Sequence, residues 1–137
     1  MKDTLVKAMA GDFRIYAART THLVGEAVRR HDCLPVAAAA LGRTMTGALL
    51  LAANLKNEEA LTVKFAGAGP LGAIVADAVP EGFVRGYVEH PHVNLPLNAK
   101  GKLDVGAGVG TGLVTVTRFT GLKEPVAGSS EIVTGEI

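Results

Sequence analysis

Two histidines separated by one residue form the best candidate for a metal site in this sequence. His90 and His92 flank Pro91, and the spacing His-x-His lets two imidazoles bind one metal ion from an extended strand. No nearby acid or cysteine plainly completes a ligand set. The single cysteine, Cys33, excludes an internal disulfide and a cysteine-rich zinc site. We therefore expect no metal site in this chain, and we interpret Cys33 as an inert, partly buried thiol.

Side chains that could perform catalysis do not form a recognisable pattern. The only serines are Ser129 and Ser130, and they lack the glycine-flanked turn that exposes a catalytic serine in hydrolases. No nucleophile is placed beside a histidine base, and no pair of carboxyl groups indicates acid–base chemistry. The sequence therefore predicts a protein that is not an enzyme and has no catalytic residues.

A glycine-rich stretch offers a second kind of chemistry, the binding of phosphate groups. Residues Gly67 to Gly72 match the dinucleotide pattern G-x-G-x-x-G after a predicted strand. A dinucleotide site also needs a helix after the glycines, because the helix N-terminus faces the pyrophosphate. Here a short β-branched run follows and Pro80 ends it, so a strand–loop–strand hairpin fits better. Binding of a nucleotide or another small molecule by Gly67–Gly72 is the alternative function. A second glycine-rich run, residues 105–112, lacks the Lys-Ser/Thr pair of a P-loop and is interpreted as a loop.

Hydrophobic periodicity defines the elements that would position these residues. Phe13, Ile15 and Ala17 alternate with polar or small residues as in a half-buried strand, paired with residues 4–10 in a hairpin. Thr20 and Thr21 can cap a helix that runs to about residue 31, and a second helix is predicted over residues 35–56. Further strands are predicted over residues 61–66, 73–79, 83–89, 113–118 and 131–137, with a loose stretch over residues 91–112.

The second helix, PVAAAALGRTMTGALLLAANLK, is about as long as a membrane span, but Arg43 lies near its middle. A central arginine costs roughly 2.5–3.5 kcal/mol on membrane-insertion scales, and alanine and glycine offset little of it. Because the helix is apolar around nearly its whole circumference, it must be covered on most sides. We therefore predict an α+β fold in which mainly antiparallel sheets pack around a largely buried helix, and no membrane span.

Arg43 then needs a partner inside the protein. A buried guanidinium without a carboxylate or several carbonyl groups would be very costly. Asp77, in a predicted apolar strand, and Glu26, on the preceding helix, are the candidate partners.

Composition narrows the class of protein further. The chain has 137 residues, is 48% hydrophobic and carries a formal net charge of +1. This length is most simply one globular domain, and the balanced charge gives no indication of nucleic-acid binding. The N-terminal residues lack the apolar core of a signal peptide. We therefore expect a cytoplasmic protein.

Motifs spread in order along the whole chain resemble one known family. They are YAARTT (16–21), RRH (29–31), ALGRTM (40–45), LTVK (61–64), GPLGAIVADA (69–78), GKLDV (101–105), GLKEP (121–125) and GEI (135–137). Together they resemble the bacterial 33 kDa chaperonin family, the redox-regulated heat-shock holdases. The structural signature positions are Arg19, Thr20, Arg43, Thr44, Gly69, Pro70, Gly72 and Asp77.

The resemblance implies an ATP-independent chaperone that holds unfolding client proteins under oxidative stress and forms a homodimer when active. It also implies an N-terminal core domain with a helix between sheets. In the family, a separate C-terminal domain binds zinc through four cysteines when reduced and forms disulfides when oxidised.

This chain departs from the family pattern in its length. It has a mass of 14.1 kDa and contains no C-x-C or C-x-x-C motif. We therefore expect residues 1–137 to be one N-terminal core domain, truncated, without the zinc and redox-switch domain. Cys33 matches none of the switch cysteines. We expect no cofactor in this chain, with zinc implied only for the full-length family member. The client-binding residues are not identified by the sequence.

Overall fold

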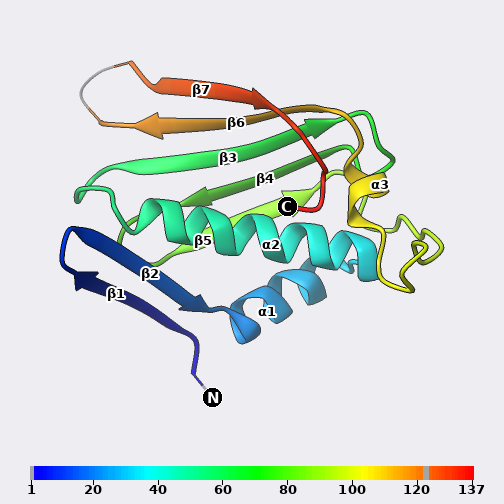
Figure 1. Ribbon diagram of the computed structural model, residues 1–137, viewed down its shortest axis with the longest axis horizontal. Helices are drawn as coiled ribbons and strands as arrows, with labels where there is room; N and C mark the ends of the chain where they lie inside the picture. Colours follow the sequence, from blue (N-terminus) through cyan, green and yellow to red (C-terminus); the bar gives the residue numbers. More distant parts are fainter. Residues whose placement is uncertain (1, 122–123) are drawn as a thin grey trace.

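The computed structural model describes residues 2–121 and 124–137, which form two antiparallel sheets and three helices (Figure 1). The small sheet pairs β1 with β2, and the large sheet has the strand order β5-β4-β3-β6-β7. The α+β fold with mainly antiparallel strands is therefore confirmed. In chain order the elements are β1 (Thr4–Ala10), β2 (Phe13–Arg19), α1 (Thr21–His31), α2 (Pro35–Ala52), β3 (Ala60–Gly67), β4 (Ala73–Ala78), β5 (Val84–Val88), α3 (Val105–Val109), β6 (Gly112–Phe119) and β7 (Val126–Glu131).

Alternation along the central strands creates one buried face on the large sheet. Leu61 and Val63 of β3 are buried, as are Ile74 and Ala76 of β4, while the residues between them are more exposed. The β3–β4 register places Val63 opposite Ala76. Because side chains alternate between the two faces of a strand, this register gathers the apolar set on the face that α2 covers.

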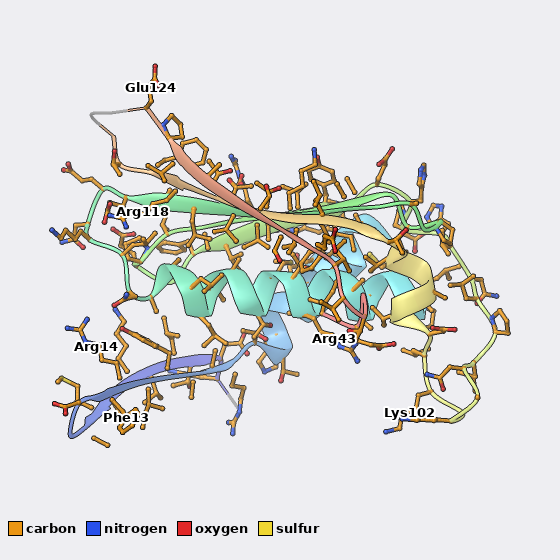
Figure 2. The ribbon with its side chains drawn as sticks, turned by 45° about the horizontal axis from the view of Figure 1, so that its top comes forward. Phe13, Arg14, Arg43, Lys102, Arg118 and Glu124 are labelled. Atoms are coloured by element: carbon orange, nitrogen blue, oxygen red, sulfur yellow. The ribbon has the colours of Figure 1, made fainter. Side chains whose placement is uncertain are left out.

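The long helix α2 lies between the large sheet and the β1–β2 hairpin, as Figure 2 shows. Ten of its eighteen residues are buried: Val36, Ala37, Ala40, Leu41, Gly42, Thr44, Met45, Ala48, Leu49 and Ala52. The prediction that sheets pack around this helix is confirmed, but the helix is partly rather than largely buried. By length and composition alone α2 could cross a membrane, and half of that span is buried inside the protein.

Glycines set how closely the layers approach. A Cβ at Gly86 of β5 would lie 3.1 Å from Met45 Cγ and 3.3 Å from Leu41 Cδ1. A Cβ at Gly42 of α2 would lie 2.7 Å from Val24 Cγ1 on α1. The absence of a side chain at each position therefore allows α2 to pack tightly against β5 on one side and α1 on the other.

A residue from outside the helix caps α1. Thr20 occupies the N-cap position but makes no capping hydrogen bond with its side chain. Instead, the Asp3 carboxylate accepts hydrogen bonds from the backbone N–H groups of His22, at 3.0 Å, and Leu23, at 2.7 Å. The predicted threonine cap is therefore wrong. Thr20 Oγ1 lies 2.8 Å from Thr46 Oγ1, so this hydroxyl joins the start of α1 to α2 instead.

Two predicted boundaries and one predicted loop are also wrong. The helix α2 ends at Ala52 rather than at residue 56. The last strand is residues 126–131 rather than 131–137, because pairing with β6 selects the segment VAGSSE in spite of its weak strand propensity. The glycine-rich stretch contains the short helix α3, where Val105 and Val109 are buried and Asp104 Oδ1 accepts a hydrogen bond from the Ala107 N–H.

The hairpin presents the opposite face from the one its apolar pattern suggested. Tyr16 Oη donates a hydrogen bond to Asn54 Oδ1 at the end of α2, at 2.8 Å, and Arg14 Nη1 donates to the same oxygen. Figure 2 shows Phe13 on the side of the hairpin away from α2. Phe13 is 74% exposed and Ile15 is 50% exposed. The face that turns inward therefore carries the half-buried Leu5, Tyr16 and Ala18, and the polar contact with Asn54 is made from this face.

Candidate functional site

The glycine motif, Gly67–Gly72, forms the hairpin loop between β3 and β4, and other protein atoms occupy the space beside Gly67 and Gly69. Gly69 N–H donates to the Val109 carbonyl at 2.9 Å, and Leu71 N–H donates to the Gly108 carbonyl at 3.0 Å. A Cβ at Gly67 would collide with the Val109 carbonyl oxygen. The predicted strand–loop–strand hairpin is confirmed, since β3 leads through this loop into β4. The glycines serve the packing of α3, and their surroundings leave no cradle for a pyrophosphate.

An apolar hollow lies at the other end of β3. It has a volume of about 460 Å³ and lies between Phe83 and Phe119, with Thr62 and Asp77 among its polar lining residues. The first three residues of β3, Ala60 to Thr62, line the hollow, whereas Gly67 is the last residue of that strand. The hollow and the glycine loop are therefore separate features, and none of the residues Gly67–Gly72 lines the hollow.

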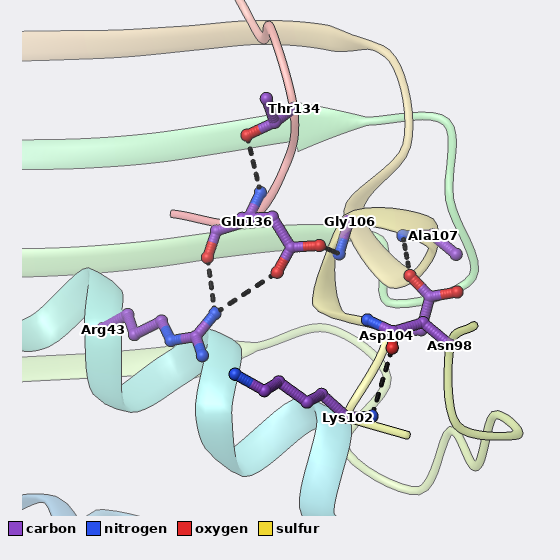
Figure 3. A network of polar contacts seen from close by, with 8 residues as sticks. All are labelled: Arg43, Asn98, Lys102, Asp104, Gly106, Ala107, Thr134 and Glu136. Atoms are coloured by element: carbon purple, nitrogen blue, oxygen red, sulfur yellow. Dashed lines mark hydrogen bonds and ion pairs between the residues drawn. The ribbon is translucent and has the colours of Figure 1, made fainter. Parts of the chain in front are cut away.

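Arg43 is joined to the last residues of the chain (Figure 3). Its Nη1 donates a hydrogen bond to the Glu136 backbone carbonyl at 2.6 Å and lies 3.6 Å from Glu136 Oε2. Glu136 Oε1 accepts from the Gly106 N–H at 3.2 Å, and Glu136 N–H donates to Thr134 Oγ1 at 3.3 Å. One glutamate thus connects α2 to the start of α3.

The predictions of a buried Arg43 and of Asp77 or Glu26 as its partner are wrong. The Arg43 side chain is 45% exposed, because it lies on a side of α2 that neither sheet covers. Asp77 instead accepts a hydrogen bond from Thr62 Oγ1 at 2.6 Å and pairs with Arg85 at 3.2 Å. The expectation of a carbonyl or carboxylate partner is confirmed, since the Glu136 residue supplies both.

Glu26 has its partners on its own helix. Its carboxylate pairs with Arg29 at 2.6 Å and Arg30 at 2.7 Å. These hydrogen bonds, first from Arg29 and then from Arg30, lower the pKa of Glu26 to about 2. All three side chains are well exposed, so the cluster is a solvated helix face rather than a site.

The signature residues lie at several places in the fold rather than in one site. Thr44 is buried and donates from Oγ1 to the Ala40 carbonyl at 2.8 Å. Pro70 is exposed in the β3–β4 loop, and Gly72 in the same loop has a φ of +69°. Arg19 ends β2. Thr44 is the one buried residue of the signature, and it packs inside α2. The common role of the eight residues as a signature stays a prediction.

The histidines and the cysteine also occupy different environments. His92 Nε2 lies 3.3 Å from Asp32 Oδ2, and His90 Nε2 lies 3.6 Å from Glu89 Oε1. Within residues 2–121 and 124–137 no three potential ligands come together as a metal site. Cys33 is half-buried, and burial, followed by the charge of Asp32, raises the pKa of its thiol. Because the thiolate is the reactive form, the prediction of an inert thiol is supported.

The outward face of the β1–β2 hairpin is the candidate functional surface, and the sequence pattern did not identify it. Strand pairing places Val6 opposite Ala17 and Ala8 opposite Ile15 on one face. All six apolar residues of this face are exposed: Val6, Ala8, Ala10, Phe13, Ile15 and Ala17. We name this set the hairpin face. A contiguous apolar surface of this kind is typical of protein–protein contact.

Comparison with known proteins places the whole chain in one family. A sequence model described as "Hsp33 protein" matches residues 3–137. The chain is 55% identical over 139 residues to the 33 kDa chaperonin of Desulforamulus reducens, covering 100% of this chain and 47% of that protein. It is also 55% identical over 138 residues to the 33 kDa chaperonin of Bacillus subtilis, covering 98% of this chain and 47% of that protein. The chain therefore spans about half the length of these curated relatives.

A solved structure shows the same fold. The crystal structure of the 33 kDa chaperonin from Thermotoga maritima matches with a TM-score of 0.80 and 43% sequence identity, over 83% of this chain and 39% of that one. Most of the arrangement described above is therefore shared with an experimentally determined relative.

Proposed function

Because the chain belongs to the Hsp33 protein family, we propose that it is the polypeptide-binding core of an ATP-independent holdase chaperone. The observation that carries the proposal is the hairpin face, where Phe13 is 74% exposed and Ile15 is 50% exposed with no charged residue between them on that face. An unfolding protein exposes apolar side chains, and burying them against such a face is favourable by about 25 cal/mol per Å². The clients proposed are unfolded or aggregating proteins of no fixed sequence.

The direct test is suppression of aggregation. Citrate synthase heated until it unfolds scatters light, and we expect the 137-residue chain to reduce that scattering in proportion to its concentration, without ATP. An equal concentration of lysozyme is the control for nonspecific protein. A chain that leaves the scattering unchanged at a severalfold molar excess would contradict the proposal.

We further propose that zinc binding and redox control belong to the parts of the relatives that this chain does not span. A single cysteine, Cys33, cannot supply four thiolates, so the residues present do not fit the family's zinc site. Suppression of aggregation by this chain is therefore expected to be unchanged by hydrogen peroxide or by a zinc chelator. A chelator-dependent activity would show that control resides within these 137 residues.

The remaining proposals concern partners and location. We propose one N-terminal core domain over residues 1–137, a homodimer as the active form of the full-length protein, and a cytoplasmic location without binding to nucleic acid or membrane. The formal net charge of +1 supports the absence of nucleic-acid binding. The partial burial of α2 supports a core helix rather than a membrane span. Sedimentation of the full-length relative with and without peroxide tests the dimer.

A further inference from the structure

The strand β7 is an edge of the large sheet that lacks the usual protection against pairing with other chains. Figure 1 shows it along the free edge, beyond β6. All six of its residues are exposed, and its single charge is Glu131 at its end. Among the described residues, every other edge strand carries a cation: Lys7 in β1, Arg14 in β2 and Arg85 in β5. Charges on an edge strand, lysine above all, are how proteins block edge-to-edge pairing.

The register shows which backbone groups of β7 face away from the sheet. Ile132 N–H donates to the Gly112 carbonyl at 2.9 Å, directly beyond the pairing of Leu113 with Glu131. In an antiparallel pair, hydrogen-bonded and non-hydrogen-bonded positions alternate. The N–H groups of Ala127, Ser129 and Glu131 therefore point outward, while those of Val126, Gly128 and Ser130 point toward β6. The outward groups form a row that another extended backbone can join.

The side chains of β7 place little in the way of an incoming strand. Ala127 to Ser130 are alanine, glycine and two serines, so both faces beside the open edge are lined by small groups. Small side chains provide no pockets that would select particular residues of the incoming strand. Binding at this edge would depend on main-chain hydrogen bonds, which every polypeptide can make.

We propose that β7 binds an extended segment of an unfolded polypeptide, which adds to the large sheet as a further strand. This inference rests on the proposed function, and it adds a backbone contact to the side-chain contact at the hairpin face. A sequence-independent edge suits clients that share no motif and differ only in being unfolded.

The size of the edge favours this occupant over a second copy of the chain. Six residues of extended strand span about 20 Å, so edge-to-edge pairing of two β7 strands would bury about 200–300 Å² on each partner. Stable protein–protein interfaces bury about 800 Å² on each partner. Pairing through β7 alone is thus too small for a stable dimer, but it matches a reversible contact with one segment of a flexible client.

Amide hydrogen exchange of the unaltered 137-residue chain tests the proposal. The probe is reduced, carboxymethylated α-lactalbumin, which is permanently unfolded, and its binding is followed separately by fluorescence anisotropy. At saturation we expect the amides of Ala127, Ser129 and Glu131 to exchange about tenfold more slowly. The amides of Val126, Gly128 and Ser130, already paired with β6, are the internal control. Binding of the probe without slower exchange at the three outward amides would overturn the inference and leave the proposed function standing.

A proline variant gives an independent measurement. Ala127→Pro removes one outward N–H and leaves the pairing of its neighbours with β6 in place, so the affinity for the probe should fall severalfold. Ala127→Val keeps the N–H and is the matched control. Equal affinity of the two variants would overturn the inference, and if Ala127→Pro does not fold, the exchange experiment decides.

Complete lack of probe binding by the unaltered chain would reject the proposed function and the inference together. Protection of the outward amides that requires high chain concentration and no probe would assign the edge to a second copy and overturn the proposal.

Discussion

Arg43 and Glu136 are 93 residues apart in the sequence, yet the arginine Nη1 donates a 2.6 Å hydrogen bond to the glutamate's backbone carbonyl. The glutamate side chain reaches the Gly106 N–H at the start of α3. The central helix, the short helix and the last residues of the chain therefore meet at one point (Figure 3).

Replacing Arg43 should loosen this junction. Arg43→Met removes the hydrogen bond that the charged guanidinium donates to the Glu136 backbone carbonyl. Hydrogen bonds that involve a charged group contribute about 1.5–3 kcal/mol. Because the Arg43 side chain is 45% exposed, we expect a loss of about 1–2 kcal/mol of unfolding free energy. Glu136→Gln keeps the backbone carbonyl and should cost less than about 1 kcal/mol. Urea denaturation measures both, and an equal loss in the two variants would contradict the dominance of the carbonyl contact.

Asp3 should make stability depend on pH at acidic values. Hydrogen bonds from the N–H groups of His22 and Leu23, with that from His22 the stronger effect, lower the pKa of the Asp3 carboxyl below 3.8. A carboxyl whose folded-state pKa is depressed stabilises the protein above its unfolded pKa, and this contribution is lost as pH falls through the folded value. Asp3→Asn should therefore lower the melting temperature at pH 7.

The difference between Asp3→Asn and the unaltered protein should shrink as the pH drops below about 4. Asp12→Asn is the control, since Asp12 is an exposed acid in the hairpin turn. Melting curves at a series of pH values check this, and a pH-independent difference would show that the charge of Asp3 is not what stabilises α1.

Two glycine-to-alanine changes should act in opposite directions. A Cβ at Gly67 would collide with the Val109 carbonyl oxygen, whereas a Cβ at Gly47 in α2 meets nothing within 4 Å. Gly67→Ala should destabilise the protein by about 2 kcal/mol or more, because backbone must shift. Gly47→Ala should stabilise it by about 0.5–1 kcal/mol through helix propensity. Thermal denaturation distinguishes them, and a Gly67→Ala variant as stable as the unaltered protein would refute the packing of α3 against the end of β3.

Polar substitutions on the hairpin face should reduce chaperone activity without reducing stability. Phe13→Ser with Ile15→Ser removes the two largest exposed side chains of that face, so suppression of citrate synthase aggregation should fall severalfold. Phe83→Ser is the matched control, because Phe83 is also 74% exposed but precedes β5. Equal loss of suppression in the two variants would mean that general hydrophobicity, and not the hairpin face, binds clients.

The reactivity of Cys33 should respond to its neighbour. The charge of Asp32, after burial, raises the pKa of the thiol, so Asp32→Asn should lower that pKa and speed reaction with a disulfide reagent near pH 8. Asparagine tolerates the left-handed backbone of position 32, where φ is +52°. The rate measured against pH checks this, with urea-unfolded protein as the fully exposed reference. A reaction rate unchanged by the substitution would show that burial alone raises the pKa of the Cys33 thiol.

Local patterns were sufficient to predict most of the fold. Apolar alternation identified β3, an apolar β-branched run identified β4, and the small residues of α2 predicted a helix packed against or between sheets. These patterns work because each element's own residues determine which face is buried. The same patterns failed for β7, whose residues Val126–Glu131 have weak strand propensity and become a strand through pairing with β6. The two large apolar residues of β2 suggested its buried face, but the face that turns toward α2 carries Tyr16 with its bond to Asn54.

The candidate surfaces were harder to predict for the same reason. The exposure of Phe13 depends on a contact between β2 and the end of α2, which no local pattern shows. The partner of Arg43 is Glu136, 93 residues further along the chain. The sequence offered instead Glu26, on the preceding helix, and Asp77, in a predicted apolar strand. The open edge of β7 follows from strand order alone, and strand order in an antiparallel sheet with a long β5–β6 connection is not contained in hydrophobic periodicity.

The position of β3 between β4 and β6 has a consequence during synthesis on the ribosome. The strands β4 and β5 are complete by Val88, but β6 begins only at Gly112. At 5–20 residues per second, the intervening stretch takes about 1–5 s to emerge. If β3, β4 and β5 pair as they emerge, we expect one side of β3 to be an open edge for that time. We therefore expect a protein of a chaperone family to expose, while it is being made, the unpaired backbone that is typical of the clients proposed for it.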